Sequence, residues 1–385
     1  MSPAAVSADA AKMVAFPRSG EPDVPAAQDR KIRFAASSDT RFWRTVRARA
    51  DRYFASAGTG RGADALLWTK ALFYAGLTEA AYSLTLLGGF NAAGTLASAI
   101  VFGISSILLA INVGHDAAHN AFTRSPLLNR MLHAYAFSVI GLDPYLWRLC
   151  HARSHHVFPN VNKCDIDIDS NVFLRLSPNH PRRPHQRFQH LYAPFLYMIV
   201  GMQSALVQDV CYLFKRELAN MRDISHPPLQ YVLFFVRKAF YVSLVFVVPM
   251  MVLPFPWWQV LLGFFIMSAV SSMIFIYLLI GTPFAEGTEF PQIGSDGHLP
   301  HDFATHAMVT SLDWQPTSRI AQWIAGGANA HVAHHLFPHV SHAHYIPLTR
   351  IIEDAAKEFG LPYRRTTFLG SIRSHFRFLH QMSVA

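Results

Sequence analysis

The chain has 385 residues, of which 51% are hydrophobic and only 15% are charged, against roughly 25% in a typical soluble domain. The mean hydropathy is positive at +0.20, which excludes an ordinary soluble enzyme and predicts an integral membrane protein with sizeable polar parts. The net charge of +9 would suit nucleic acid, but the chain carries no nucleic-acid motif, so we expect its basic residues to face anionic lipid on the cytoplasmic side.

The N-terminal segment is poor in apolar runs. Residues 1–30 are rich in Pro, Ala, Ser and charge, and we expect them to be disordered, which leaves residues 31–385 as a single domain. Residues 41–55 carry Phe42, Val46 and Ala50 at helical spacing. This pattern predicts a short amphipathic helix on the membrane surface.

Apolar runs long enough to cross the hydrocarbon core follow in two pairs, at about residues 66–88, 91–113, 231–253 and 257–281. A fifth stretch, residues 191–213, is less apolar. It contains Gln203, Gln208 and Asp209, which are costly in lipid. We therefore expect two transmembrane hairpins, with residues 191–213 as an interfacial helix.

Eight of the 21 histidines fall into three clusters, each close to an apolar stretch. The members are His115 and His119, then His151, His155 and His156, and finally His331, His334 and His335. Spacings of three and four place imidazoles one turn apart on one face of a helix, where they can converge on a metal. Three such clusters in one chain indicate a metal centre, whereas one pair alone would not.

Charge and parity predict the topology. No Lys or Arg occurs between positions 71 and 123 or between 239 and 318, so both hairpin tips are free of basic residues. By the positive-inside rule, both termini and the histidine clusters face the cytoplasm. The second and third clusters can share a site only if an even number of crossings separates them. This again places residues 191–213 in the interface.

In order, spacing and topology, the three clusters resemble the histidine boxes of the membrane fatty acid desaturases. The resemblance covers about residues 32–380 and includes the stretches Gly114–Asn120 and Asn329–Pro338. It implies an all-α integral membrane protein of four transmembrane helices under a cytoplasmic helical cap. It also implies a di-iron centre, because eight histidines are too many for one ion but suit two. By the same resemblance His306 is expected as a ninth ligand, and Asp302, one turn before it, as the holder of a metal-bound water.

Further polar residues lie close in sequence to the boxes. A ligating histidine usually donates its second N–H to a carboxylate or carbonyl group. The residues therefore expected to support the ligands are Asp116, Asn120, Asp165, Asp167 and Asn329.

The activity implied by the resemblance is oxygen-dependent insertion of a cis double bond into a fatty acyl chain, carried as an acyl-lipid or an acyl-CoA. The partners implied are the acyl substrate, O2, membrane lipid and an external electron donor of the ferredoxin or cytochrome b5 type. No heme-binding HPGG motif and no ferredoxin cysteines occur in the chain, so we expect a separate donor.

Two positions of the last box depart from the family pattern. Ala333 stands where related chains carry a glutamate, so a carboxylate expected beside the metal is missing. His331 stands where most front-end desaturases have glutamine, which argues against front-end selectivity.

Two other functions remain open. A di-iron lipid hydroxylase or ketolase would share this fold, and a membrane zinc hydrolase would also use HxxxH, although the glutamate of HExxH is absent from every box.

Overall fold

The computed structural model describes residues 32–35, 41–169 and 171–384, and helices dominate this part of the chain. The prediction for residues 1–30 lies outside it. Helices α3 (Ala65–Leu87) and α4 (Ala92–Leu109) pack against each other as a hairpin. Each begins at a side-chain cap, because Asp64 and Asn91 accept hydrogen bonds from the backbone N–H groups of Leu67 and Gly94.

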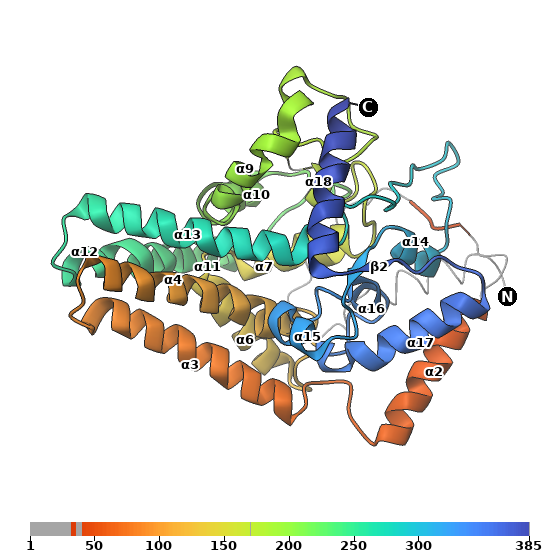
Figure 1. The fold of residues 1–385 in the computed structure, drawn as a ribbon, viewed down its shortest axis with the longest axis horizontal. Coiled ribbons are helices and arrows are strands. Elements are labelled where there is room, and N and C mark those ends of the chain that lie inside the picture. Colours follow the sequence, from red (N-terminus) through yellow and green to blue (C-terminus); the bar gives the residue numbers. More distant parts are fainter. Residues whose placement is uncertain (1–31, 36–40, 170, 385) are drawn as a thin grey trace.

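The second hairpin is formed by α11 (Pro228–Val242), η5 (Ser243–Val247) and α12 (Val248–Val252), followed by α13 (Trp257–Leu279). Pro254 and Pro256 fall in the turn between them, where no helical N–H is needed. Helix α13 also packs against α4 and thereby joins the two hairpins. In Figure 1, α3, α4, α12 and α13 extend away from the end of the molecule that holds α2, α14, α16 and α17.

Four helices of the described chain are long and apolar enough to cross a membrane: Ala92–Ala118, Pro184–Phe214, Pro228–Val252 and Trp257–Leu279. The number agrees with the prediction, but one member differs. Helix α3 is not among these four helices, because Lys70 and Glu79 lower its mean hydropathy. The helix Pro184–Phe214, which contains the stretch predicted to be interfacial, is among them. Which of these two helices crosses the bilayer stays a prediction, and the interfacial assignment of residues 191–213 depends on it.

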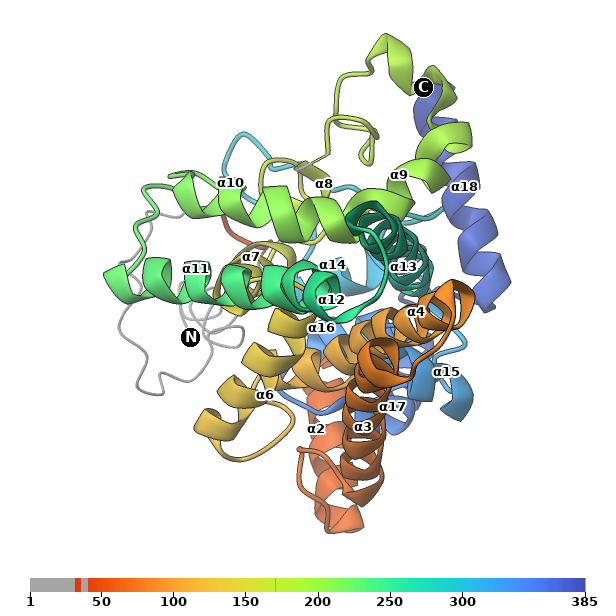
Figure 2. The same ribbon diagram turned by 90° about the vertical axis from the view of Figure 1, so that its left-hand side faces the viewer.

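That stretch forms a nearly continuous helix made of η3 (Pro184–Phe188), α9 (Gln189–Gln203), η4 (Ser204–Gln208) and α10 (Asp209–Phe214). It lies above α11 and α13 in Figure 2. Asp209, which would be costly in lipid, is buried inside the protein, and Lys238 of α11 donates to its carboxylate at 2.7 Å. The charge is thus paired within the protein, which removes one reason to exclude this helix from the membrane.

The cap contains helices α14 (Phe303–Val309), α15 (Arg319–Ala325), α16 (His331–Leu336), η6 (His342–His344) and α17 (Tyr345–Glu358), together with α2 (Arg41–Ala57). The predicted amphipathic helix is α2, but its predicted location at the membrane surface gains no support. Its apolar residues Phe42, Val46 and Ala50 pack against α14, α16 and α17, so this face is already covered by protein.

The remaining elements are short segments around the histidines and a C-terminal helix. The shorter ones are η1 (Ala110–Gly114), α5 (His115–Ala118), α6 (Pro126–Val139), α7 (Pro144–Cys150), η2 (His151–His155) and α8 (Ile166–Asp169). Strands β1 (Asp313–Trp314) and β2 (Arg365–Thr366) form a small parallel pair, and α18 (Phe368–Val384) packs against α9.

Candidate metal centre

The eight box histidines converge between the inner ends of the hairpins and the cap, as their spacing predicted. Ring nitrogens of one group lie within 4.8 Å of one another, and its members are His115, His119, His151 and His334. A second group of the same compactness contains His155, His331 and His335. The ring of His156 lies between the groups, with centroids 4.4 Å from His334 and 4.5 Å from His335. Two neighbouring groups of imidazoles suit two metal ions.

The second cluster is built differently from the α-helical turn that its spacing suggested. It lies in the π-helical turn η2, in which the N–H of His156 donates to the carbonyl of His151, five residues earlier, at 2.9 Å. A π turn holds more residues than an α turn, so residues five apart come onto one face. The Nε2 atoms of His151 and His156 are 3.0 Å apart, while His155 turns towards the third cluster. One cluster therefore contributes to both groups.

Burial sets the protonation of these rings. It lowers the pKa of six of them well below the usual histidine value, and neighbouring imidazoles lower it further for His119, His151, His156, His331, His334 and His335. Neutral imidazole is the form that binds metals. Several buried ring nitrogens, namely Nδ1 of His156 and His335 and Nε2 of His334, have no hydrogen-bond partner. Unsatisfied buried acceptors are costly, and a metal ion would satisfy them.

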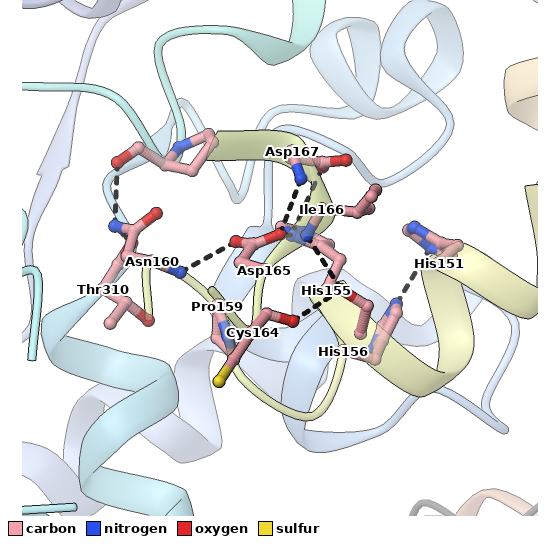
Figure 3. Close-up of polar contacts among 12 residues, drawn as sticks. His151, His155, His156, Pro159, Asn160, Cys164, Asp165, Ile166, Asp167 and Thr310 are labelled. Carbon is pink, nitrogen blue, oxygen red and sulfur yellow. Dashed lines mark hydrogen bonds and ion pairs between the residues drawn. The ribbon is translucent and has the colours of Figure 1, made fainter. Parts of the chain in front are cut away.

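His155 differs because carboxylates hold its Nδ1 (Figure 3). This atom lies 3.2 Å from both carboxylate oxygens of Asp165 and 3.3 Å from Asp167 Oδ2. Although burial acts in the opposite direction, the two carboxylates raise the pKa of His155 to about 9. Nδ1 is directed at the carboxylates, which leaves Nε2 to bind a metal ion in place of its proton. The expectation that Asp165 and Asp167 support the boxes agrees with this geometry.

Asp165 is itself fixed by the loop that follows the second cluster. Its Oδ2 accepts a hydrogen bond from the backbone N–H of Asn160 at 2.8 Å (Figure 3). The Asn160 side-chain amide donates to the carbonyls of Pro283, Glu289 and Thr310 at 3.1 to 3.2 Å. This fully buried amide therefore ties the support of His155 to the ends of α13 and α14.

Asp313 and Tyr345 support the third cluster, and sequence reasoning missed both. A carboxylate oxygen of Asp313 accepts a hydrogen bond from the N–H of Val332, in the first turn of α16, at 3.1 Å. Its other oxygen accepts the Tyr363 hydroxyl at 2.6 Å. Nδ1 of His334 lies 3.1 Å from the Tyr345 hydroxyl, which leaves Nε2 for a metal. Asp313 is 19 positions from Val332, so no local spacing could have indicated the contact.

Asp116 follows His115 but points away from the groups. Its carboxylate accepts hydrogen bonds from Ser341 Oγ at 2.9 Å and from the backbone N–H and Nδ1 of His342 at 3.1 and 2.9 Å. Nε2 of His342 is 3.1 Å from Lys70 Nζ, so a buried chain of polar groups connects the first cluster, the segment after the third and α3. Asn329 donates to the Gln315 carbonyl at 3.2 Å, and its Oδ1 is buried without a partner.

His306 and Asp302 lie outside the two groups. Nε2 of His306 is 2.9 Å from the Pro159 carbonyl oxygen, and its buried Nδ1 has no partner. The Asp302 carboxylate caps α14, because it accepts hydrogen bonds from the N–H groups of Ala304 and Thr305 and from the Thr305 hydroxyl. A metal ligand role for His306 and a water-holding role for Asp302 therefore stay predictions.

Ala333 packs against the cap. It is fully buried in the apolar core of the cap, together with Ala304, Ala307 and Met308. On α16 it lies about 200° around the axis from His331, because each helical residue turns by about 100°. This packing gives no support to a carboxylate beside the metal at this position, so that expectation stays a prediction.

Comparison with known proteins agrees with this arrangement. Residues 91–367, which is most of the chain, match the family model described as fatty acid desaturase. The chain is 29% identical over 346 residues to the sn-1 linoleoyl-lipid 6-desaturase of Synechocystis sp., covering 89% of this chain and 96% of that protein. It is 26% identical over 370 residues to the acyl-lipid (8-3)-desaturase of Physcomitrium patens, covering 94% of this chain and 76% of that protein. The chain is therefore a membrane protein of the fatty acid desaturase family, whose members are oxidoreductases.

Proposed function

We propose that this protein is an oxygen-dependent acyl-lipid desaturase that forms a cis double bond with two iron ions at the two histidine groups. The observation that carries the proposal is the convergence of all eight box histidines into adjacent, buried groups of imidazoles. The acyl-lipid form of the substrate is favoured over acyl-CoA because the relatives named above act on linoleoyl-lipid or on acyl-lipids.

Iron suits the donor set. Both groups consist of imidazoles, which are good iron ligands. Iron, when bound, supplies the redox chemistry that removal of hydrogen from an unactivated methylene pair requires, whereas zinc has none. The chain's own residues hold the ligands in place: Asp165 and Asp167 orient His155, Tyr345 orients His334, and Asp313 fixes the start of α16. We also propose His306 as a further ligand through its unpartnered Nδ1.

The acyl chain is proposed to lie among the hairpin helices. A crevice of about 50 Å³ is lined by residues of α4, α6, α9, α11, η5 and α13, among them Gly103, Tyr241, Met267 and Ser271. It is smaller than an acyl chain, so Met267, a flexible side chain, would have to move on binding. Enclosing the acyl chain among the helices would position one pair of its carbons and exclude water.

The membrane arrangement follows the basic residues. We propose that both termini and the metal centre face the cytoplasm, because both hairpin tips lack Lys and Arg. Electrons are proposed to come from a ferredoxin or a cytochrome b5 type donor that docks on the basic cytoplasmic side.

Two other functions were weighed. A hydroxylase or ketolase of the same fold would use the same histidines, and only its product differs. The zinc hydrolase has lost support, because the chain belongs to the desaturase family. The expectation against front-end selectivity gains no support from relatives named 6-desaturase and (8-3)-desaturase, so the position of the new double bond is left to experiment.

Expression in a host with a suitable electron donor, followed by mass spectrometry of the lipid-bound fatty acids, tests the proposal. We expect an acyl product two hydrogens lighter than its precursor, two irons per purified chain, and loss of the product in His155→Ala. A product heavier by one oxygen would indicate the hydroxylase instead. One zinc per chain without iron would overturn the proposed chemistry.

A further inference from the structure

A groove of about 440 Å³ lies along α18 and includes none of the eight box histidines. It is lined by Glu286, Arg373, Phe376, Arg377, His380 and Gln381. Five of these lie on α18 at spacings of three and four, so one face of the helix forms most of the lining. The groove is therefore built by a regular element and not by a loop.

The groove carries more positive charge than its own acidic group balances. Arg373 and Arg377 are both exposed and lie one helical turn apart. The guanidinium of Arg377 lies 3.4 Å from the Glu286 carboxylate, which also accepts from Gln381 at 3.1 Å. Within the described residues, Arg373 has no acidic partner. The two guanidinium groups lie one turn apart, and a single carboxylate offsets only one of their two positive charges. Such a pair suits a ligand with a phosphate group.

The helix that packs against α18, α9, exposes apolar side chains. The ring of His380 packs on that of His190 in α9, with centroids 4.8 Å apart, and Phe376 packs in the core shared by α9, α13 and α18. The neighbouring α9 exposes Leu191 and Phe195, at 62% and 68% of their surface. Large exposed side chains of this kind on a membrane protein are suited to lipid tails.

We infer that the α18 groove binds the phosphate of an anionic phospholipid headgroup, with the acyl tails lying along α9. The phosphate would be held between Arg373 and Arg377, and it would displace Glu286 from Arg377 on binding. Glu286 therefore acts as an internal competitor for the site. This inference does not depend on the proposed desaturase activity, because a lipid anchored here lies outside the metal centre.

Native mass spectrometry of the full chain, released from nanodiscs of either phosphatidylglycerol or phosphatidylcholine, tests the inference. We expect wild type to retain phosphatidylglycerol at least tenfold better than phosphatidylcholine. The double variant Arg373→Gln/Arg377→Gln should lose this preference, and Arg350→Gln, an exposed arginine of α17, should keep it. Glu286→Gln should retain more phosphatidylglycerol than wild type, because the competing carboxylate is gone.

Equal retention of the two lipids by wild type, or an unchanged preference in the double variant, would overturn the inference. Soluble glycerol phosphate serves as a second arm. If it displaces labelled phosphatidylglycerol completely at millimolar concentration, the site recognises free phosphate esters and the lipid assignment is wrong. Metal content, measured on each variant, reports correct folding. The single variant Arg373→Gln is milder than the double variant, because it breaks no ion pair seen in the described structure.

Discussion

The carboxyl group of Asp313 accepts a hydrogen bond from the backbone N–H of Val332 at 3.1 Å, and thereby fixes the first turn of the helix that carries three of the eight box histidines. Burial raises the pKa of Asp313 to about 7, against hydrogen bonds from Tyr363 and from the backbone of Val332 and His331. The third histidine cluster is therefore positioned by a residue that binds no metal itself.

Replacing Asp313 by Ala should leave the Val332 N–H and the Tyr363 hydroxyl unsatisfied in the interior. We expect a loss of about 1–3 kcal/mol in the free energy of unfolding and fewer metal ions per chain. Tyr363→Phe is the matched control, since it removes one hydrogen bond to Asp313 and keeps the hydrogen bond from Val332 in the first turn of α16. Thermal unfolding together with metal analysis measures both effects. Full metal content in Asp313→Ala would contradict the positioning role.

Asp165 and Asp167 both approach Nδ1 of His155 but differ in exposure, and this allows a paired test. The Asp165 side chain is fully buried, whereas that of Asp167 is 48% exposed. Asp165→Asn should weaken metal binding about 10- to 100-fold, because the imidazole loses its orienting partner. Asp167→Asn should have a smaller effect, because water screens its charge. Metal affinity from chelator competition ranks the two, and an equal effect would show that burial does not decide the support of His155.

Ala333 lies in the apolar core of the cap, so introducing the family's glutamate there should affect stability and not the metals. We expect Ala333→Glu to lower the free energy of unfolding by at least about 2 kcal/mol, because the carboxylate is buried without a partner. Ala48→Glu, at an exposed position of α2, is the control and should change little. If Ala333→Glu were as stable as wild type but altered metal content, position 333 would border the metal centre after all.

The lowered pKa values of the cluster histidines predict how the metal-free protein responds to acid. A group whose folded pKa lies below its unfolded value of about 6.5 takes up a proton more readily when unfolded, so stability is lost as the pH falls below 6.5. His155 acts in the opposite direction, but it is one ring against six.

The melting temperature of metal-stripped protein should therefore drop by at least about 5 °C between pH 7.5 and 5.5, since each kcal/mol corresponds to a few degrees. Differential scanning fluorimetry in detergent measures it. The metal-loaded protein serves as the comparison and should be more stable at pH 7.5, because bound ligand stabilises the folded state. A melting temperature independent of pH would show that the imidazoles are not held neutral by burial.

Much of the fold and of the site could be predicted because it depends on local patterns. Apolar runs of about 20 residues gave the helices of both hairpins, and the spacing of histidines gave the eight residues that converge. The grouping of those histidines could not be predicted, because it depends on a π turn that no spacing rule encodes. Asp313 and Tyr345 were missed for another reason. Their contacts join segments that are separated in the chain, and the sequence does not show which carboxylate or hydroxyl group will be buried beside the histidines.

The assignment of residues 191–213 shows the limit of composition. Asp209 argued against a membrane-spanning helix only as long as its partner was unknown. Lys238, nearly 30 positions later, neutralises it inside the protein. Likewise, the apolar stripe of α2 predicted a helix correctly but could not distinguish a lipid surface from the face of α17, because both bury the same side chains.

The π turn at His151–His155 has a consequence for how the second box can be spelled. Within this chain the third cluster, His331–His335, is spelled HxxHH, whereas the second, His151–His156, is spelled HxxxHH. In a regular α-helix the shorter spelling separates the first and last histidines by four residues, which places them one turn apart. The longer spelling separates them by five, and the wider turn absorbs the extra residue, so that the Nε2 atoms of His151 and His156 still lie 3.0 Å apart. We therefore expect the two spellings to present the same pair of imidazoles, with the additional residue accommodated by the pitch of the backbone and not by a loop.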